Sequence, residues 1–247
     1  MKRPRPAGRA QPLSRIEPLA DAPLVLAIDA SGPVEAVALA QGDLVLAESS
    51  RRRTRGRGSA LAARVDDVLR DADRRPDQLA AVACIVGPGS FTGIRVGVAT
   101  AQGLAAALGV PTLSWTATQA WALAAQGPVV VALDARRSEV YGQAFDVSFD
   151  GDLRELLPLS LGAPEAFFQA AIAHRDALVL GDGARLYAER LEAAWGASPR
   201  ILRHVTGPAV GAVAVRSARS LAADPSLPSQ PLRPIYLRDH DAARPSS

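Results

Sequence analysis

A glycine-rich segment in the first half of the sequence has the residue types of an anion-binding loop. It reads Gly87-Pro88-Gly89-Ser90-Phe91-Thr92-Gly93 and precedes a helix that we expect over residues 92–108. At such a junction, backbone N–H groups and the helix N-terminus can hold an anion, and glycine permits close backbone approach. Arg95 adds a possible cationic partner. Because the segment lacks the Gly-Lys-Ser/Thr ending of a P-loop, a tight packing turn is the alternative interpretation.

Two aspartates end apolar stretches that resemble each other. Leu24-Val-Leu-Ala-Ile-Asp29 and Val129-Val-Val-Ala-Leu-Asp134 each precede a short turn and a second apolar stretch. Actin-like enzymes place carboxylates that face metal and phosphate at such strand ends. An aspartate that caps its own turn is the structural alternative. The turn after Asp134 contains Arg136 and Arg137, which argues against a complete ATP site.

The other reactive side chains do not form a catalytic set. Cys84 lies inside an apolar stretch, where we expect a buried structural cysteine, and Ser90 is not in a G-x-S-x-G nucleophile elbow. The histidines at 174, 204 and 240 are too scattered for a metal or base site. We therefore predict no catalytic residue and no metal site.

Composition and charge exclude several classes of protein. The chain has 247 residues, of which 48% are hydrophobic and 21% charged, which favours a packed fold over a disordered chain or a fibre. The net charge of +3 arises within residues 1–22, so the remainder is not a generally basic, nucleic-acid-coating body. The arginine-rich run 51–57 is either a solvated loop or an RNA contact. We expect a cytoplasmic protein, because we find no signal peptide or membrane span and the single cysteine suits a reducing compartment.

The order of the expected elements indicates an α/β fold. Three strands joined by short turns precede helix, strand, helix, strand and helix, the order of a ribonuclease-H-like mixed sheet. The expected strands are Leu24–Asp29, Val34–Ala40, Leu44–Glu48, Leu79–Val86 and Val110–Ser114, and the expected helices are 59–73, 92–108 and 116–125. A second copy begins at Val129. Such a duplication is the actin-like (ASKHA) architecture, with two lobes of which the second is reduced.

The second copy gives fewer signals than the first. We expect strands at 129–134, 139–145 and 177–180 and helices at 164–174, 183–195 and 208–222, whereas residues 146–163 show no clear pattern. The predicted division is a disordered tail over 1–22, an N-terminal ribonuclease-H-like lobe over 23–126, a smaller C-terminal lobe over 127–238 and a disordered tail over 239–247.

Small residues at helical spacing predict close packing of one helix. Gly93, Gly97 and Ala101 recur every fourth residue, so another element can approach, either inside the lobe or across an interface. The preceding helix carries an apolar stripe that includes Leu61 and Val65.

Four motifs, in order along most of the chain, resemble the TsaB/YeaZ family. The most specific is Val86-Gly-Pro-Gly-Ser-Phe-Thr-Gly-Ile-Arg-Val-Gly-Val98, followed by Ala101-Gln-Gly-Leu-Ala105. The others are Leu26-Ala-Ile-Asp-Ala-Ser31, Leu133-Asp-Ala-Arg-Arg-Ser-Glu-Val-Tyr141 and Pro234-Ile-Tyr-Leu-Arg238.

The resemblance implies a non-catalytic scaffold subunit of a tRNA-modifying complex. That complex transfers a threonylcarbamoyl group to N6 of the adenosine adjacent to the tRNA anticodon. The implied partners are a TsaD-type catalytic subunit, a TsaE-type ATPase, tRNA through the complex and, for the lone subunit, a second copy. No cofactor is implied for the isolated subunit, and ATP or ADP only within the complex. The residues then expected at the subunit interface are Leu61, Val65, Val68, Leu69, Ile94, Gly97, Val98, Ala101 and Leu104.

Two functions of other classes stay open. One is an actin-like ATP-binding protein or kinase that uses the Gly87–Gly93 loop with Asp29 and Asp134. The other is a glycoprotease-like peptidase, for which we nominate Ser90 and Cys84 as the candidate nucleophiles.

Overall fold

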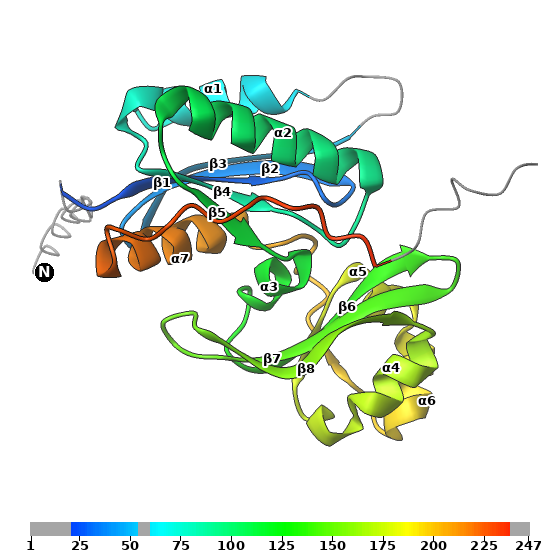
Figure 1. Cartoon of the computed structure of the whole chain (residues 1–247). Coiled ribbons are helices and arrows are strands. Elements are labelled where there is room, and N and C mark those ends of the chain that lie inside the picture. The colour runs from blue at the N-terminus through cyan, green and yellow to red at the C-terminus, as the bar shows by residue number, and fades with distance from the viewer. Residues whose placement is uncertain (1–20, 54–59, 238–247) are drawn as a thin grey trace, which may run out of the picture.

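The structure, a computed structural model, describes residues 21–53 and 60–237. Of the predicted tails, 1–22 and 239–247, only residues 21 and 22 are described. Residues 54–57 of the arginine-rich run also lie outside the described residues. Two five-stranded mixed sheets form two lobes (Figure 1), with strand orders β3-β2-β1-β4-β5 and β8-β7-β6-β9-β10. Because both sheets have the same order and the same strand directions, the predicted duplication and actin-like fold are confirmed.

The elements alternate along the chain much as the sequence predicts. The strands of the first sheet are β1 (Leu24–Asp29), β2 (Val34–Gln41), β3 (Leu44–Arg52), β4 (Ala81–Ile85) and β5 (Thr112–Trp115). Those of the second are β6 (Gly127–Arg136), β7 (Glu139–Val147), β8 (Leu153–Gly162), β9 (Leu178–Leu180) and β10 (Arg200–Ile201). The α-helices are α1 (Leu61–Asp71), α2 (Phe91–Leu108), α3 (Ala117–Ala122), α4 (Pro164–Ala170), α5 (Asp182–Leu186), α6 (Ala188–Trp195) and α7 (Val210–Ala223).

The first sheet is covered on both faces, which explains its uninterrupted apolar strands. Every residue of β1 and β4 is buried. A strand in the middle of a sheet that is covered twice has no solvent side, so it does not alternate between apolar and polar residues. Helices α1 and α2 lie over one face, and α7 lies over the other (Figure 1).

The last helix of each repeat packs against the sheet of the other lobe. Helix α3 follows the first sheet but contacts β6 and β7, whereas α7 follows the second sheet and contacts β1, β2, β3 and β4. The predicted assignment of 127–238 to a separate second lobe is therefore wrong for its last part. One apolar core joins both sheets through these helices, and it contains Ala27, Trp121, Val131 and Val213.

The second lobe differs from the sequence prediction at three places. Strand β8 gave no signal because it is an edge strand with Pro158 inside it and no fully buried residue. Strand β10 has only two residues. The single helix expected over 183–195 is two helices, α5 and α6, that meet at Tyr187.

Ion pairs fasten the turn between β7 and β8 to the first lobe. Arg216 of α7 pairs with Asp152, and Arg219 pairs with Asp43 and with Asp150. Together with the shared core, these contacts hold the two lobes together away from the glycine-rich loop.

Candidate functional site

The Gly87–Gly93 loop is tied to its neighbours by its own backbone. The N–H of Ser90 donates to the carbonyl of Ser31 at 2.7 Å, and the carbonyl of Gly87 accepts from Ala117 N at 2.7 Å. A Cβ on Gly89 would lie 2.3 Å from the carbonyl oxygen of Ser31, so only glycine fits there. The geometry therefore supports the packing turn, and an anion at this loop stays a prediction.

Two groups of the protein already occupy the N-terminus of α2. The hydroxyl of Ser90 caps the helix by accepting from Gly93 N at 3.3 Å. The guanidinium of Arg53 lies against Gly93, where a Cβ would come within 2.5 Å of Nη1, and its Nη2 donates to the carbonyl of Gly32 at 2.7 Å. No local sequence pattern indicated that Arg53 would reach this position.

Asp29 is a buried carboxyl group at the end of β1. Its Oδ1 accepts from the backbone N–H of Ser31 at 2.8 Å and from the Ser31 hydroxyl at 2.7 Å. Its Oδ2 is buried without a hydrogen-bond partner among the described residues. Desolvation raises the pKa of Asp29 to about 6, although the Ser31 hydrogen bonds and the charge of Arg53 act in the opposite direction.

Asp134, at the equivalent strand end of the second lobe, has a different environment. Its Oδ1 accepts from Arg136 N at 2.9 Å, and its Oδ2 pairs with Arg136 Nη1 at 3.1 Å. Its own N–H donates to Asp182 at 2.9 Å. Here the turn-capping alternative describes the geometry, because both carboxyl oxygens are used within the β6–β7 turn.

A cation and two aromatic rings meet at the first turn of α2. The guanidinium carbon of Arg95 lies 3.8 Å from the centre of the Phe91 ring, and Arg95 Nε donates to the Tyr236 hydroxyl at 3.1 Å. The Phe91 and Tyr236 ring centres are 5.1 Å apart. Two of the four sequence motifs therefore meet here. Sequence spacing alone did not indicate this, because 141 residues separate Arg95 from Tyr236.

The C-terminal segment 225–237 brings Tyr236 to this position by running along the edge of β5. The N–H of Gln230 donates to the carbonyl of Thr112 at 2.7 Å, and its side-chain Oε1 accepts from Ser114 N at 2.8 Å. Further along, Ile235 N donates to the carbonyl of Val86 at 2.8 Å. The segment thus covers the sheet edge and fixes the residue before the glycine-rich loop.

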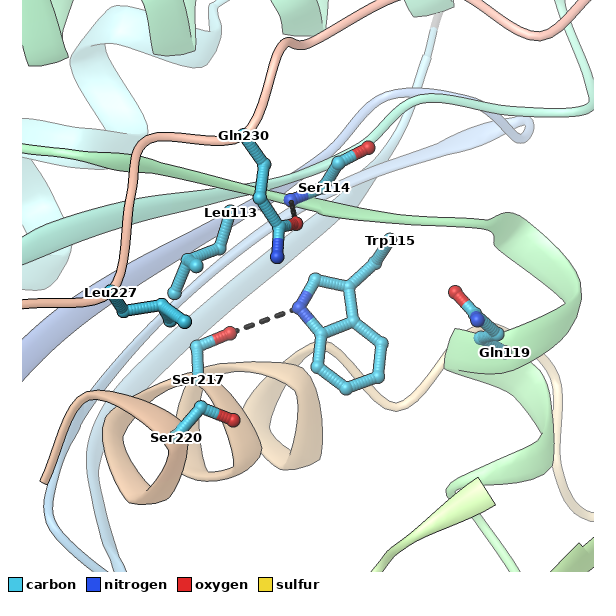
Figure 2. Close-up of a pocket in the computed structure, with 8 residues that line it drawn as sticks. All are labelled: Leu113, Ser114, Trp115, Gln119, Ser217, Ser220, Leu227 and Gln230. Carbon is cyan, nitrogen blue, oxygen red and sulfur yellow. Dashed lines mark hydrogen bonds between the residues drawn. The ribbon is translucent and has the colours of Figure 1, made fainter. Parts of the chain in front are cut away.

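A pocket of about 250 Å³ lies beneath this segment (Figure 2). In it, the indole nitrogen of Trp115 donates to the Ser217 hydroxyl at 3.0 Å, and the Gln230 side chain lies above (Figure 2). The lining side chains are uncharged: Leu113, Ser114, Trp115, Gln119, Ser217, Ser220, Leu227 and Gln230. None of the residues predicted for a site lines this pocket.

The residues predicted as the subunit interface are core residues of the first lobe. Eight of them are buried beneath α1 and α2, and Leu104 is half-buried: Leu61, Val65, Val68, Leu69, Ile94, Gly97, Val98 and Ala101 are the eight. Their assignment as contact residues is wrong, because the small-residue stripe lets α2 approach the sheet. A Cβ on Gly97 would lie 3.5 Å from the Cβ of Ala30.

The outer face of α2 carries a second set of small residues. Ala99, Gly103, Ala106 and Ala107 are exposed, and a Cβ on Gly103 would meet no atom within 4 Å. No charged residue follows Arg95 in this helix. An interface on the N-terminal-lobe helices stays a prediction, now with these exposed residues as its contacts.

The predicted absence of a nucleophile and of a metal set can be compared with the described residues. Cys84 is fully buried, as expected, and desolvation raises the pKa of its thiol. Ser90 is engaged as the helix cap. Among residues 21–53 and 60–237, no three His, Cys, Asp or Glu side chains are grouped as a metal site, and His240 lies outside them.

Helix α2 is the one described helix that is long and apolar enough to cross a membrane by length and composition alone. In this fold it covers the first sheet, and Ile94 and Ala101 on its inner face are buried. Its apolar composition is accounted for by packing on one side and by small residues on the other.

Comparison with known proteins gives a consistent picture. Residues 55–154 match the family model TsaD, described as tRNA N6-adenosine threonylcarbamoyltransferase. The chain is 31% identical over 137 residues to the tRNA threonylcarbamoyladenosine biosynthesis protein TsaB of Bacillus subtilis, covering 54% of this chain and 59% of that protein. It is 36% identical over 154 residues to the uncharacterized protein Rv3421c of Mycobacterium tuberculosis, covering 57% of this chain and 72% of that protein.

Among solved structures, the chain is similar to YeaZ from Pseudomonas aeruginosa. The TM-score is 0.73 at 27% identity, and the match covers 87% of this chain and all of that one. In sequence, the chain spans about three fifths of the length of the Bacillus relative.

Proposed function

Because the chain belongs to the TsaB/YeaZ family, we propose that it acts in tRNA threonylcarbamoyladenosine biosynthesis as a non-catalytic subunit. In this proposal it binds a TsaD-type catalytic subunit in the cytoplasm and holds it in an active geometry. A TsaE-type ATPase, tRNA and any nucleotide join the complex, and the lone subunit pairs with a second copy.

The observation that supports the non-catalytic role is the apolar core that the two lobes share. Kinases and related enzymes close domains around their ligand by hinge motion. Here one apolar core runs through both sheets, and Arg216 and Arg219 fasten the β7–β8 turn to the first lobe. Asp134 is also held by Arg136. These features favour a scaffold over an enzyme that opens and closes.

The outer face of α2 supports a protein partner. It combines exposed small residues with no charge between Arg95 and the helix end, so a partner helix can approach closely without desolvating an ion. The proposed contacts are Ala99, Gly103, Ala106 and Ala107.

The test uses the full chain mixed with the TsaD-type subunit of its own organism, followed by size-exclusion chromatography with light scattering. We expect a heteromeric complex, and we expect Ala106→Glu to weaken it at least tenfold, because the carboxylate would be buried in the contact beyond reach of Arg95. The matched control is Ala193→Glu, the same change at an exposed position of α6 in the second lobe. Equal binding by both variants would reject the α2 face, and no complex with the unchanged chain would reject the scaffold role.

One observation favours a second function, binding of Mg-ATP by the lone subunit. Asp29 has a buried oxygen without a partner and stands at the strand end where actin-like enzymes place such a carboxylate. Calorimetry of the isolated chain with Mg-ATP decides between the two functions. Micromolar binding that Asp29→Asn abolishes would favour the ATP-binding alternative.

A further inference from the structure

We propose that Arg95, Phe91 and Tyr236 form an anchor that grips a carboxylate of the protein partner at one end of the α2 face. This inference rests on the proposed function and adds to it the chemistry that the partner must present. The three residues are called the anchor cluster below.

The anchor cluster holds the guanidinium in one orientation. Phe91 lies against one face of Arg95, with 3.8 Å between the guanidinium carbon and the ring centre, and Tyr236 accepts from Nε at 3.1 Å. Stacking and a hydrogen bond together restrict a side chain that otherwise loses much rotamer freedom on binding.

Both Nη groups of the oriented Arg95 guanidinium are available to bind another molecule. Within the described residues, no acceptor takes a hydrogen bond from Nη1 or Nη2 of Arg95, and no carboxylate lies within ion-pair distance of it. A guanidinium with both Nη groups available matches a carboxylate with two parallel hydrogen bonds.

The cluster is also accessible, and its rings are exposed to an unusual degree. Phe91 is 39% exposed and Tyr236 is 36% exposed, and Leu237 beside it is 38% exposed. Exposed aromatic residues next to an arginine are the residue types that dominate binding energy at protein interfaces. The C-terminal segment supplies Tyr236 and Leu237 to this surface. Its path along β5 therefore both covers the sheet edge and places Tyr236 beside Arg95.

The neighbouring surface favours a protein partner over a nucleic acid. From Arg95 toward the C-terminus of α2, the exposed face continues through Ala99 and Gly103 without another cation. At the other end of the helix, Arg53 already donates to the carbonyl of Gly32. A polyanionic backbone is held by several cations along its length, whereas a protein helix can cover small uncharged residues and place one acid at Arg95. The anchor cluster and the small-residue face thus form one continuous surface.

The experiment measures the affinity of the full chain for the TsaD-type subunit by titration calorimetry. We expect Arg95→Ala to weaken binding by about 10-fold to 100-fold, and Arg95→Lys to recover little of the loss because it keeps the charge but not the fork. Tyr236→Phe, which loses only the hydroxyl, should have a smaller effect of the same sign. The matched control is Arg233→Ala, an exposed arginine of the same segment.

Salt dependence tests the carboxylate itself. The affinity of the unchanged chain should fall between 50 and 500 mM NaCl, and the affinity of Arg95→Ala should fall less, since one ion pair is missing. The melting temperature of each variant should stay within about 4 °C of that of the unchanged chain, because each substitution removes at most a few exposed contacts.

Each remaining outcome rejects a definite part of the account. If Arg95→Ala binds within twofold of the unchanged chain while Ala106→Glu does not bind, the anchor is wrong and the α2 interface stands. If neither variant changes binding, the proposed interface fails as well. If Arg95→Ala weakens only tRNA binding by the assembled complex, the cluster contacts RNA and the protein anchor is rejected.

Discussion

The two faces of α2 are built from the same kinds of residue and do different things. The inner face places Gly93, Gly97 and Ala101 against the sheet, where a Cβ on Gly93 would lie 2.0 Å from the carbonyl oxygen of Ala30. The outer face presents Ala99 and Gly103 to solvent, where a Cβ on Gly103 meets nothing within 4 Å. Small residues thus allow close approach on both sides, to the chain's own sheet and, as we propose, to a partner.

Replacing a glycine by alanine on the inner face of α2 should have the largest effect on stability. Gly93→Ala forces a methyl group into the Ala30 carbonyl and the Arg53 guanidinium, so strand β1 or the helix must move. We expect a loss of about 3 kcal/mol in the free energy of unfolding, the upper part of the usual range for overpacking. Urea denaturation followed by circular dichroism measures it, and a loss below 1 kcal/mol would show that the inner face is not tightly packed.

Asp29, the buried aspartate at the end of β1, should make the stability of the protein depend on pH. Its pKa is about 6 in the folded chain, against an ordinary value of 3.8, so the folded state binds more protons than the unfolded state between pH 4 and 6. The free energy of unfolding therefore falls as pH rises through that window, by about 3 kcal/mol at most, and is level above pH 7.

Replacing this carboxyl group should stabilise the protein. Asp29→Asn keeps an oxygen for the two Ser31 hydrogen bonds and removes the buried charge, so at pH 7.5 we expect a gain of about 1–3 kcal/mol and a flatter pH profile. Denaturation at pH 4.5, 6 and 7.5 measures both chains. If the stability of the unchanged chain does not fall between pH 4.5 and 7.5, or if the Asn variant keeps the same slope, the raised pKa is wrong.

The matching change on the outer face should have the smallest effect and the opposite sign to Gly93→Ala. Gly103→Ala adds a methyl group in open space in a helix interior, so we expect a gain of about 0.5–1 kcal/mol. The same denaturation experiment checks it. If Gly103→Ala destabilises the isolated chain, the outer face is not free as described.

Local patterns predicted most of the fold, and long-range contacts account for what they missed. The duplication was predictable from the apolar strands that end in Asp29 and Asp134, because each repeat begins with the same local pattern of strand, turn and antiparallel strand. The exchange of α3 and α7 between lobes was not predictable in this way, since helical periodicity shows that a face is buried and not which sheet buries it.

The candidate site shows the same limit. The stripe at Gly97 was identified correctly as a close-packing surface, but its period is the same for a sheet and for a partner. The residues predicted from it as partner contacts are therefore buried against the chain's own sheet. The contact of Tyr236 with Arg95 had no local signal, because only the path of residues 225–237 along β5 brings the two together.

The central claim is that the outer face of α2 binds the partner, and hydrogen–deuterium exchange of the chain with and without the TsaD-type subunit tests it most directly. The account predicts slower exchange in peptides covering residues 91–108 and 232–237 on complex formation, and unchanged exchange in α6, residues 188–195. Protection confined to the second lobe, with α2 unchanged, would contradict it.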